Sequence, residues 1–271
     1  MRIRSIFFAL ATVSAAVLTI AAAPLQSAAQ EAPAATPPAC SGPAELVRLD
    51  HVLARTARQL TRAQPLRIVA IGSSSTAGAG SSTSAMSYPS RLQVELQVLF
   101  PRSPITVFNR GVNGETATDM LARFDSGVLV EKPDLVLWQA GSNSVLRDQP
   151  VAPAGGLMRD GLARLKSAGA DVVLINPQYA PKVLAKPGIH GMVDLFDATA
   201  RELHVNLFQR FALMRYWRLT EDLPFSAFLS SDELHMNDWS YGCLAKLLAG
   251  SIAEAATRPV PTVTAIAKPR S

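Results

Sequence analysis

Two short segments near opposite ends of the chain carry side chains that could perform nucleophilic catalysis. Ser74 stands in a run of small hydroxyl residues, 73–76 (Ser-Ser-Ser-Thr), that follows Gly72, and Asp232 stands three residues before His235. On a turn, that spacing lets a carboxylate orient the imidazole and stabilise its protonated form. A histidine held in this way can take the proton of a serine hydroxyl, which is a poor nucleophile at neutral pH. An Asp-x-x-His pair also occurs as a capping or surface pair, so the pair alone leaves both interpretations open.

Glycine and asparagine in the middle of the chain could supply hydrogen-bond donors for such a reaction. Gly114 lies in the segment 109–116, and without a side chain its backbone N–H can approach a ligand closely. Asn143 lies in the segment 138–144, where its amide could donate to an oxyanion. Both residues also have a structural interpretation, because glycine is common in turns at positive φ and asparagine often caps a turn.

Several other kinds of site lack the residues that they require. The segment 72–80 has no lysine after its glycines and does not match the spaced-glycine dinucleotide motif, so nucleotide binding is disfavoured. Thr76 occupies the place of the second glycine of a nucleophile elbow, which disfavours an ordinary α/β-hydrolase. No His-Glu-x-x-His pair is present, and two cysteines cannot build a four-thiolate zinc site. We therefore expect neither a metal nor a cofactor.

Short apolar runs alternate with amphipathic stretches, and this pattern predicts the elements that must position these side chains. Strands buried on both faces are expected at 66–71, 105–108, 134–138, 171–175 and 205–208. Helices are expected at 88–100, 116–130, 156–168, 192–203 and 238–256. An earlier amphipathic helix of about twenty residues starts near Leu46 and is ended by Pro65. The alternation predicts a three-layer α/β domain whose ligands bind at the carboxyl ends of the strands, where the polar segments fall.

The order of these segments resembles that of the SGNH (GDSL-type) hydrolase superfamily. Glycine-serine follows the first strand, Asn-x-Gly the second and Gly-x-Asn the third, and Asp-x-x-His precedes the last helix. The resemblance covers residues 66–256 and implies a flavodoxin-like fold with a central parallel sheet of about five strands. It implies that Ser74 is the nucleophile and that Asp232 and His235 complete a triad. It also implies an oxyanion hole made by the backbone N–H groups of Ser74 and Gly114 and the side chain of Asn143.

The chain departs from the family pattern in two places. Residues 72–74 read Gly-Ser-Ser where the family has Gly-Asp-Ser, and residues 141–144 read Gly-Ser-Asn-Ser where it has Gly-x-Asn-Asp. Neither missing aspartate is the nucleophile, the base or an oxyanion donor, so the reaction should survive. Which hydrogen bonds hold the loop after the first strand (the first loop, 72–87) and the loop after the third strand (the third loop, 140–147) is left open. The family frame selects Ser74 over Ser73 and Ser75, because the glycine stands two residues before it.

The resemblance implies a serine esterase that hydrolyses short-chain acyl esters of the acetyl type through an acyl-enzyme intermediate. Its substrate would be an acyl ester of a small molecule or a polysaccharide. An envelope polysaccharide O-acyltransferase that uses the same serine is one alternative, and a non-catalytic binding protein of the same fold is another. The sequence predicts neither the natural substrate nor the oligomeric state.

The composition and the first residues predict one globular domain in a secreted or periplasmic protein. Of 271 residues, 48% are hydrophobic and 17% are charged, which is enough apolar material for a full core. Arg2 and Arg4 precede an uncharged run at 5–23, and small residues follow at 27–29, a pattern typical of a signal peptide over 1–29. An uncleaved membrane anchor is the alternative. The other expected segments are a flexible leader (30–43), the hydrolase-like domain (44–258) and a C-terminal tail (259–271).

The net charge limits which partners are expected, and the two cysteines raise the question of a disulfide. The net charge of +5 comes from scattered basic residues, so we expect no nucleic acid partner, and no stable membrane insertion once the signal segment is removed. In an oxidising compartment Cys40 and Cys243 could form one disulfide, or they could remain two separate thiols.

Overall fold

A sheet of five parallel strands forms the centre of the computed structural model, which describes residues 37–259. The strands are β1 (Leu66–Gly72), β2 (Ile105–Gly111), β3 (Leu135–Gln139), β4 (Asp171–Ile175) and β5 (Asn206–Phe208). Their order, β2-β1-β3-β4-β5, is that of flavodoxin-like sheets. The predicted fold class is therefore confirmed. The predicted signal peptide (1–29) and nearly all of the predicted tail (259–271) lie outside the described residues.

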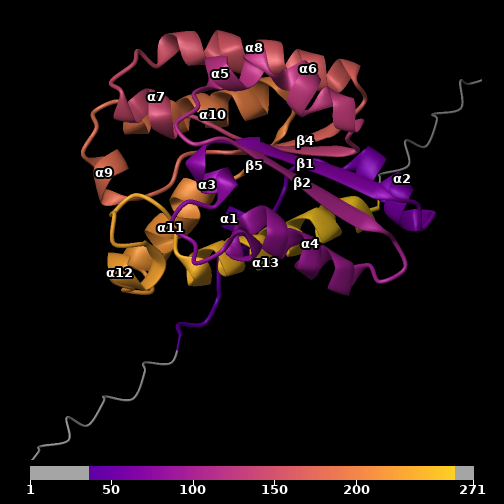
Figure 1. Ribbon diagram of the computed structural model, residues 1–271, viewed down its shortest axis with the longest axis horizontal. Coiled ribbons are helices and arrows are strands. Elements are labelled where there is room, and N and C mark those ends of the chain that lie inside the picture. The colour runs from indigo at the N-terminus through magenta and orange to yellow at the C-terminus, as the bar shows by residue number, and fades with distance from the viewer. Residues whose placement is uncertain (1–36, 260–271) are drawn as a thin grey trace, which may run out of the picture. The chain divides into compact units, whose positions relative to one another are not determined.

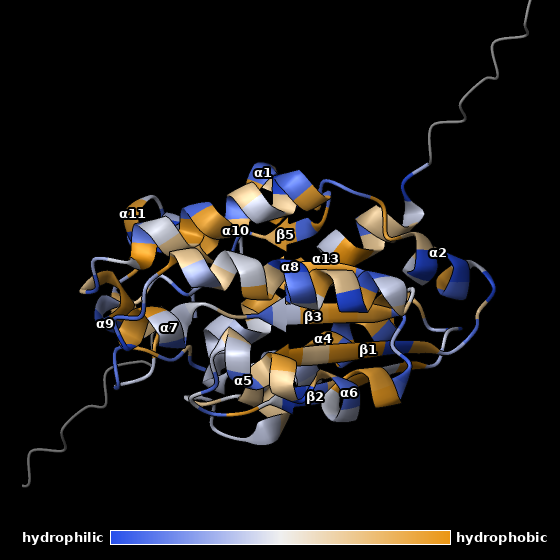
Figure 2. Ribbon diagram, turned by 90° about the horizontal axis from the view of Figure 1, so that it is seen from above, coloured by the Kyte–Doolittle hydropathy of each residue, from blue (hydrophilic) through white to orange (hydrophobic). Residues whose placement is uncertain are grey.

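Burial on both faces explains why the strands read as unbroken apolar runs. Every residue of β3 is buried, as are four of the five residues of β4, and hydrophobic residues dominate the central strands in Figure 2. The edge strand β2 continues beyond the predicted end at residue 108. Its polar residues Asn109 and Arg110 pair with Ala70 and Ile71 of β1, because an edge strand tolerates exposed side chains on a paired backbone.

Helices cover both faces of the sheet (Figure 1), with α5, α6, α8 and α10 on one face and α4 and α13 on the other. The helices are α1 (Ala44–Val47), α2 (Ala54–Thr61), α3 (Ser74–Ala77), α4 (Tyr88–Leu99), α5 (Ala117–Ala122), α6 (Phe124–Gly127), α7 (Ser142–Leu146), α8 (Ala152–Ser167), α9 (Pro181–Leu184), α10 (Ile189–Leu203), α11 (Arg210–Leu219), α12 (Phe225–Phe228) and α13 (Asp238–Thr257). Two 3-10 turns are η1 (Ser84–Met86) and η2 (Leu129–Glu131). Helix α11 was not predicted, whereas α4 and α13 lie close to their predicted positions.

The single first helix predicted between Leu46 and Pro65 is wrong, because α1 and α2 are separated by a non-helical segment. In that segment the backbone N–H of His51 donates to the side chain of Asn206 (2.8 Å), and that of Leu53 donates to the carbonyl of Ala255 (3.2 Å). Partners from distant parts of the chain thus satisfy backbone groups that a continuous helix would have satisfied itself.

The prediction of one continuous helix over 116–130 is also wrong, because this stretch forms three separate elements, α5, α6 and η2. The first break falls at Arg123, whose backbone leaves the helical region. Its guanidinium reaches back to the carboxylate of Glu115 (Nε–Oε1 2.7 Å) and to the carbonyl of Arg110 (2.8 Å). A side chain engaged outside the helix therefore accompanies the break.

Helix α2 is fastened to the amino ends of β3 and β4 by two carboxylates. The buried Asp134 accepts hydrogen bonds from Arg55 Nε and Gln59 Nε2, both at 2.8 Å, and from the backbone N–H of Arg67 at 3.0 Å. Asp171 accepts from the backbone N–H and the hydroxyl of Thr56, at 2.8 and 2.9 Å. The amino edge of the sheet is thus closed by a fully partnered set of polar groups.

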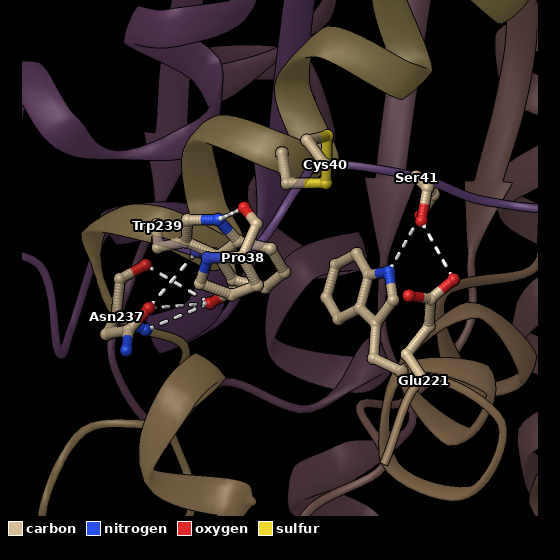
Figure 3. Close-up of a disulfide and its surroundings, with 9 residues drawn as sticks. Pro38, Cys40, Ser41, Glu221, Asn237 and Trp239 are labelled. Carbon is tan, nitrogen blue, oxygen red and sulfur yellow. Dashed lines mark hydrogen bonds between the residues drawn. A yellow bond between two sulfur atoms is a disulfide. The ribbon is translucent and has the colours of Figure 1, made fainter. Parts of the chain in front are cut away.

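The last residues of the predicted flexible leader are anchored to the C-terminal helix (Figure 3). Cys40 forms a disulfide with Cys243 of α13, with 5.3 Å between the two Cα atoms. On either side of Cys40, the carbonyl of Pro38 accepts from Trp239 Nε1 (2.9 Å) and that of Ser41 accepts from the indole of Trp217 (2.8 Å). Residues 37–43 are therefore a fixed part of the domain, contrary to the prediction for this stretch. Among residues 37–259, no helix has the length and apolar character that crossing a membrane requires.

Candidate active site

Ser74 is the first residue of α3, directly beyond the carboxyl end of β1. Its Oγ lies 2.7 Å from Nε2 of His235, although 161 positions separate the two residues in sequence. The neighbouring serines are turned away: Ser73 and Ser75 are 3% and 1% exposed, whereas Ser74 is half-buried. Of the three serines that the sequence offered, Ser74 is the one whose hydroxyl meets a histidine.

His235 lies in the turn between α12 and α13, where a carboxylate holds its ring. Its Nδ1 lies 2.5 Å from Asp232 Oδ2. Asp232 Oδ1 accepts hydrogen bonds from Ser230 Oγ (2.6 Å) and from the backbone N–H groups of Leu234 and His235 (3.0 and 2.9 Å). Burial raises the pKa of Asp232, but these hydrogen bonds outweigh it and hold that pKa well below its usual range. The ionised carboxylate accepts the Nδ1 proton, so Nε2 is free to accept a proton from Ser74.

Gln139, the last residue of β3, holds the first loop in place. Its Oε1 accepts from the backbone N–H of Ser73 (3.0 Å) and from the hydroxyls of Ser73 and Thr76, both at 3.1 Å. Sequence reasoning left open what joins the first and third loops in the absence of the family's aspartates. A neutral amide does so here, and it also ties the turn that carries Ser74 to the strand that precedes Asn143.

The second loop, which carries Gly114, is joined to the third loop by two hydrogen bonds. Asn143 Nδ2 donates to the carbonyl of Glu115 (2.8 Å), and the side chain of Arg147 donates to the carbonyl of Gly114 (2.7 Å). Gly114 adopts a positive φ of 80°. Because β2, β1 and β3 are neighbours in the sheet, the loops that carry Gly114, Ser74 and Asn143 lie side by side at one edge. Within residues 37–259, the backbone N–H groups of Ser74 and Gly114 donate to no protein acceptor.

Gly80 allows the first loop to approach the histidine turn. Its φ is 88°, and a Cβ atom at this position would lie 2.5 Å from the carbonyl oxygen of Met236 and 2.8 Å from Cβ of His235. Only glycine fits such a conformation and such a distance. The contact brings the loop after Ser74 against the turn that supplies its histidine.

The remaining histidines lie elsewhere. The rings of His51 and His204 meet edge to face, 5.8 Å apart, and line a separate cavity of about 450 Å³ together with Asp197 and Gln209. His190 packs against an aromatic ring of α11. Sequence reasoning thus selected the histidine that reaches Ser74 but missed Gln139. A polar residue at the end of an otherwise apolar buried strand was the signal that could have identified it.

The chain matches one protein family over nearly all of its described length. Residues 39–258 match the model of the non-GDSL lipase-like family. The family's name, non-GDSL, agrees with residues 72–74 of this chain, which read Gly-Ser-Ser where GDSL-type proteins have Gly-Asp-Ser. Among curated proteins, an acetylxylan esterase from Geobacillus stearothermophilus is 40% identical over 52 residues, which are 19% of this chain and 24% of that protein. This chain therefore matches only about a quarter of that relative.

Solved structures with the same fold are also esterases. A two-domain esterase active on acetylated mannans, co-crystallised with mannopentaose, is 20% identical with a TM-score of 0.62, and the match covers 80% of this chain and 59% of that one. The acetylxylan esterase from Geobacillus stearothermophilus is 21% identical with a TM-score of 0.59, covering 69% of this chain and 94% of that one. At these identities the likeness establishes the fold.

Proposed function

This chain belongs to the non-GDSL lipase-like family, and from that membership and the local geometry we propose that it is a serine esterase. It would hydrolyse short-chain acyl esters, with Ser74 as nucleophile and His235 and Asp232 completing the triad. The observation that carries the proposal is the 2.7 Å contact between Ser74 Oγ and His235 Nε2, with Asp232 on the far side of the ring. The serine contacts the histidine and the histidine contacts the carboxylate. Acyl transfer requires a nucleophile, a base and an orienting carboxylate arranged in this order.

The reaction follows from these contacts in two stages. Ser74 Oγ attacks the ester carbonyl while His235 Nε2 takes the hydroxyl proton, and Asp232 stabilises the resulting imidazolium. Collapse of the tetrahedral intermediate expels the alcohol, which receives that proton, and leaves the acyl group on Ser74. Water then attacks the acyl group while His235 Nε2 takes a proton from it. That proton passes to Ser74 Oγ as the acid is released, which restores the serine.

Three donors would stabilise the negative charge on the carbonyl oxygen. They are the backbone N–H groups of Ser74 and Gly114, which have no acceptor within residues 37–259, and the side-chain amide of Asn143. Asn143 Nδ2 carries two hydrogens, and the contact with Glu115 uses one of them. The second remains for the substrate. Preorganised donors of this kind lower the barrier by about 2.7–4 kcal/mol each.

We propose acetyl esters of a polysaccharide as the substrate class. The similar proteins act on acetylated mannans and on acetylxylan, which supports an acetyl group on a sugar chain. No metal and no cofactor enter the proposed reaction.

We also propose that the protein is exported. A positively charged start followed by an apolar run supports a signal peptide over 1–29, and the disulfide between Cys40 and Cys243 is a bond typical of oxidising compartments. In this proposal the hydrolase domain spans 44–258 together with the anchored residues 37–43, and residues 259–271 form a tail.

Serine variants test the proposal most directly. We expect Ser74→Ala to lower kcat/KM for p-nitrophenyl acetate by on the order of 10³ or more without unfolding the domain. Ser73→Ala and Ser75→Ala are the matched controls, and each should retain most of the activity. Loss of activity in a control but not in Ser74→Ala would overturn the assignment of the nucleophile.

Two further measurements separate the alternatives. With an acetylated oligosaccharide as donor, release of acetate to water supports a hydrolase, whereas transfer to an added sugar acceptor identifies an acyltransferase. A fluorophosphonate probe should label Ser74. A folded protein that is neither labelled nor active on esters would instead be a binding protein of the same fold.

A further inference from the structure

Arg210 is a buried cation beneath the proposed active site. It is the first residue of α11 and follows β5 at the same edge of the sheet as Ser74. Its side chain is 0% exposed. Nε donates to the carbonyl of Asn176 (2.9 Å) and Nη2 donates to Gln178 Oε1 (3.0 Å). Nη1 has no hydrogen-bond partner in the described part of the chain, and no carboxylate there pairs with the guanidinium.

This placement is costly for folding. Burial lowers the pKa of Arg210 to about 10, and its interactions with the phenols of Tyr241 and Tyr88 oppose that shift, so the group stays protonated at neutral pH. Removing a cation from water is unfavourable unless it is paired with an opposite charge. A cation in the first turn of a helix also faces the positive end of the helix dipole. A residue that stability alone does not explain is a candidate for function.

The contacts of Gln178 link Arg210 to two loops of the site. Gln178 Oε1 also accepts from the hydroxyl of Ser142 (2.6 Å), and its Nε2 donates to the carbonyl of Leu234 (3.4 Å). Ser142 immediately precedes Asn143, and Leu234 immediately precedes His235. One amide thus joins the segment of a proposed oxyanion donor to the segment of the proposed base.

Arg210 determines which way that amide faces. Arginine has five N–H donors and no acceptor, so the oxygen of Gln178 must face it and the NH₂ group must face Leu234. If Arg210 lost its donors, the amide could rotate by about 180°, which would place its oxygen against the Leu234 carbonyl. The Leu234 carbonyl would then lose its donor, and the hydroxyl of Ser142, which donates to the oxygen of Gln178 in the structure, would face an NH₂ group instead.

The nucleophile turn rests on the same buried cluster. Tyr241 donates to the carbonyl of Ala79 (2.8 Å), and the hydroxyls of Tyr88 and Thr76 lie 3.4 Å apart. These are the two phenols with which the charge of Arg210 interacts. The guanidinium therefore lies among the side chains that hold the first loop, the third loop and the turn that carries His235.

We propose that Arg210 is a positioning residue of the esterase, which aligns Asn143 and His235 with Ser74 by fixing the orientation of Gln178. The inference rests on the proposed function. It concerns catalysis rather than substrate affinity, because neither Arg210 nor Gln178 is exposed to a substrate.

The test compares Arg210→Met with two controls on the same helix. Arg215→Met removes an exposed guanidinium, and Leu213→Ala removes a buried apolar side chain that lies beside Gly42 and has no polar atom to offer Gln178. We expect Arg210→Met to lower kcat on p-nitrophenyl acetate about 10²-fold with KM changed by less than about threefold, the result of misaligned catalytic groups. Both controls should keep kcat within about threefold at a temperature where circular dichroism shows every variant folded. Arg210→Lys should recover part of the loss, since it restores a donor but not the planar fork.

Gln178→Leu provides a second route should Arg210→Met fail to fold. It should lower kcat to a similar degree, and the double variant should be no worse than the poorer single variant, because both act through one amide. The proposal is overturned if folded Arg210→Met or Gln178→Leu keeps kcat within about threefold of wild type, or if Leu213→Ala loses as much as Arg210→Met. An unmodified chain that hydrolyses no ester would remove the proposed function together with this inference, whereas an active chain with an equally active Arg210→Met would remove the inference alone.

Discussion

A buried charged side chain lies at each end of the central sheet, and the two differ in how completely they are hydrogen-bonded. At the amino end, Asp134 is buried and accepts three hydrogen bonds, one of them from the cation of Arg55. At the carboxyl end, Arg210 is buried at least as deeply, without a carboxylate and with Nη1 unpartnered among residues 37–259. The two groups lie at opposite ends of the same sheet, yet only one has all of its hydrogen bonds made.

This difference separates structural from functional polar groups. A buried charge that exists for stability is worth keeping only when all of its hydrogen bonds are made, and Asp134 meets that condition. Polar groups that serve a reaction must leave some capacity for substrate or hold other groups in place, so they are less completely paired. The comparison predicts that substitutions at the amino end change stability, and that substitutions at the carboxyl end change turnover.

The largest effect that we expect from this comparison is at the amino end. Asp134→Ala should lower the free energy of unfolding by about 3 kcal/mol, because it leaves the Arg67 N–H and two side chains without their acceptor. Urea denaturation measures this loss. The control is Asp125→Ala, which removes an exposed partner of Arg164 and should cost about 0.5 kcal/mol or less. A large fall in kcat for folded Asp134→Ala would contradict the division between the two ends.

A slightly smaller effect, of the opposite kind, is expected at the carboxyl end. Asn143→Ala should lower kcat about 10²-fold, equivalent to about 2.7 kcal/mol, because a donor to the oxyanion is lost. The free energy of unfolding should fall by only about 1 kcal/mol, from the lost contact with the Glu115 carbonyl. Steady-state kinetics and urea denaturation on one preparation give both values. Should stability fall as far as it does in Asp134→Ala, the distinction between the ends would not hold.

The smallest effect concerns the acid stability that Asp232 provides. Its pKa is lower in the folded than in the unfolded chain, so its contribution is present above about pH 4 and is lost as the pH falls below that value. The melting temperature of Asp232→Asn should therefore lie below that of wild type by about 2 °C near pH 6, and the gap should narrow in acid. The effect is small because this carboxylate is 42% exposed. A gap that widens on acidification would have the wrong sign.

The sequence was informative where structure and chemistry are local. Apolar runs located all five strands, and the resemblance to SGNH hydrolases, confirmed by the family match and the fold, directed attention to Ser74 and His235. The choice of Ser74 over its neighbours followed from a spacing of two residues after a glycine. The structure then showed the hydroxyls of that run facing different partners.

Contacts between distant segments were beyond the sequence. Gln178 and Arg210 act on loops that are tens of residues away, and no local pattern distinguishes them from ordinary polar residues. From the sequence alone, an arginine at the first position of a helix is expected to be exposed to solvent. The first predicted helix failed for the same reason, since its backbone found partners near Asn206 and Ala255.

The disulfide joins Cys40 and Cys243, which are 203 positions apart in the sequence, and the segment between them includes all five strands and every residue of the proposed site. Covalently, the domain is therefore a closed ring with two short ends. A protease that cuts one loop inside that ring releases no fragment: the nicked chain stays a single molecule on a non-reducing gel and separates into two pieces only after a thiol is added.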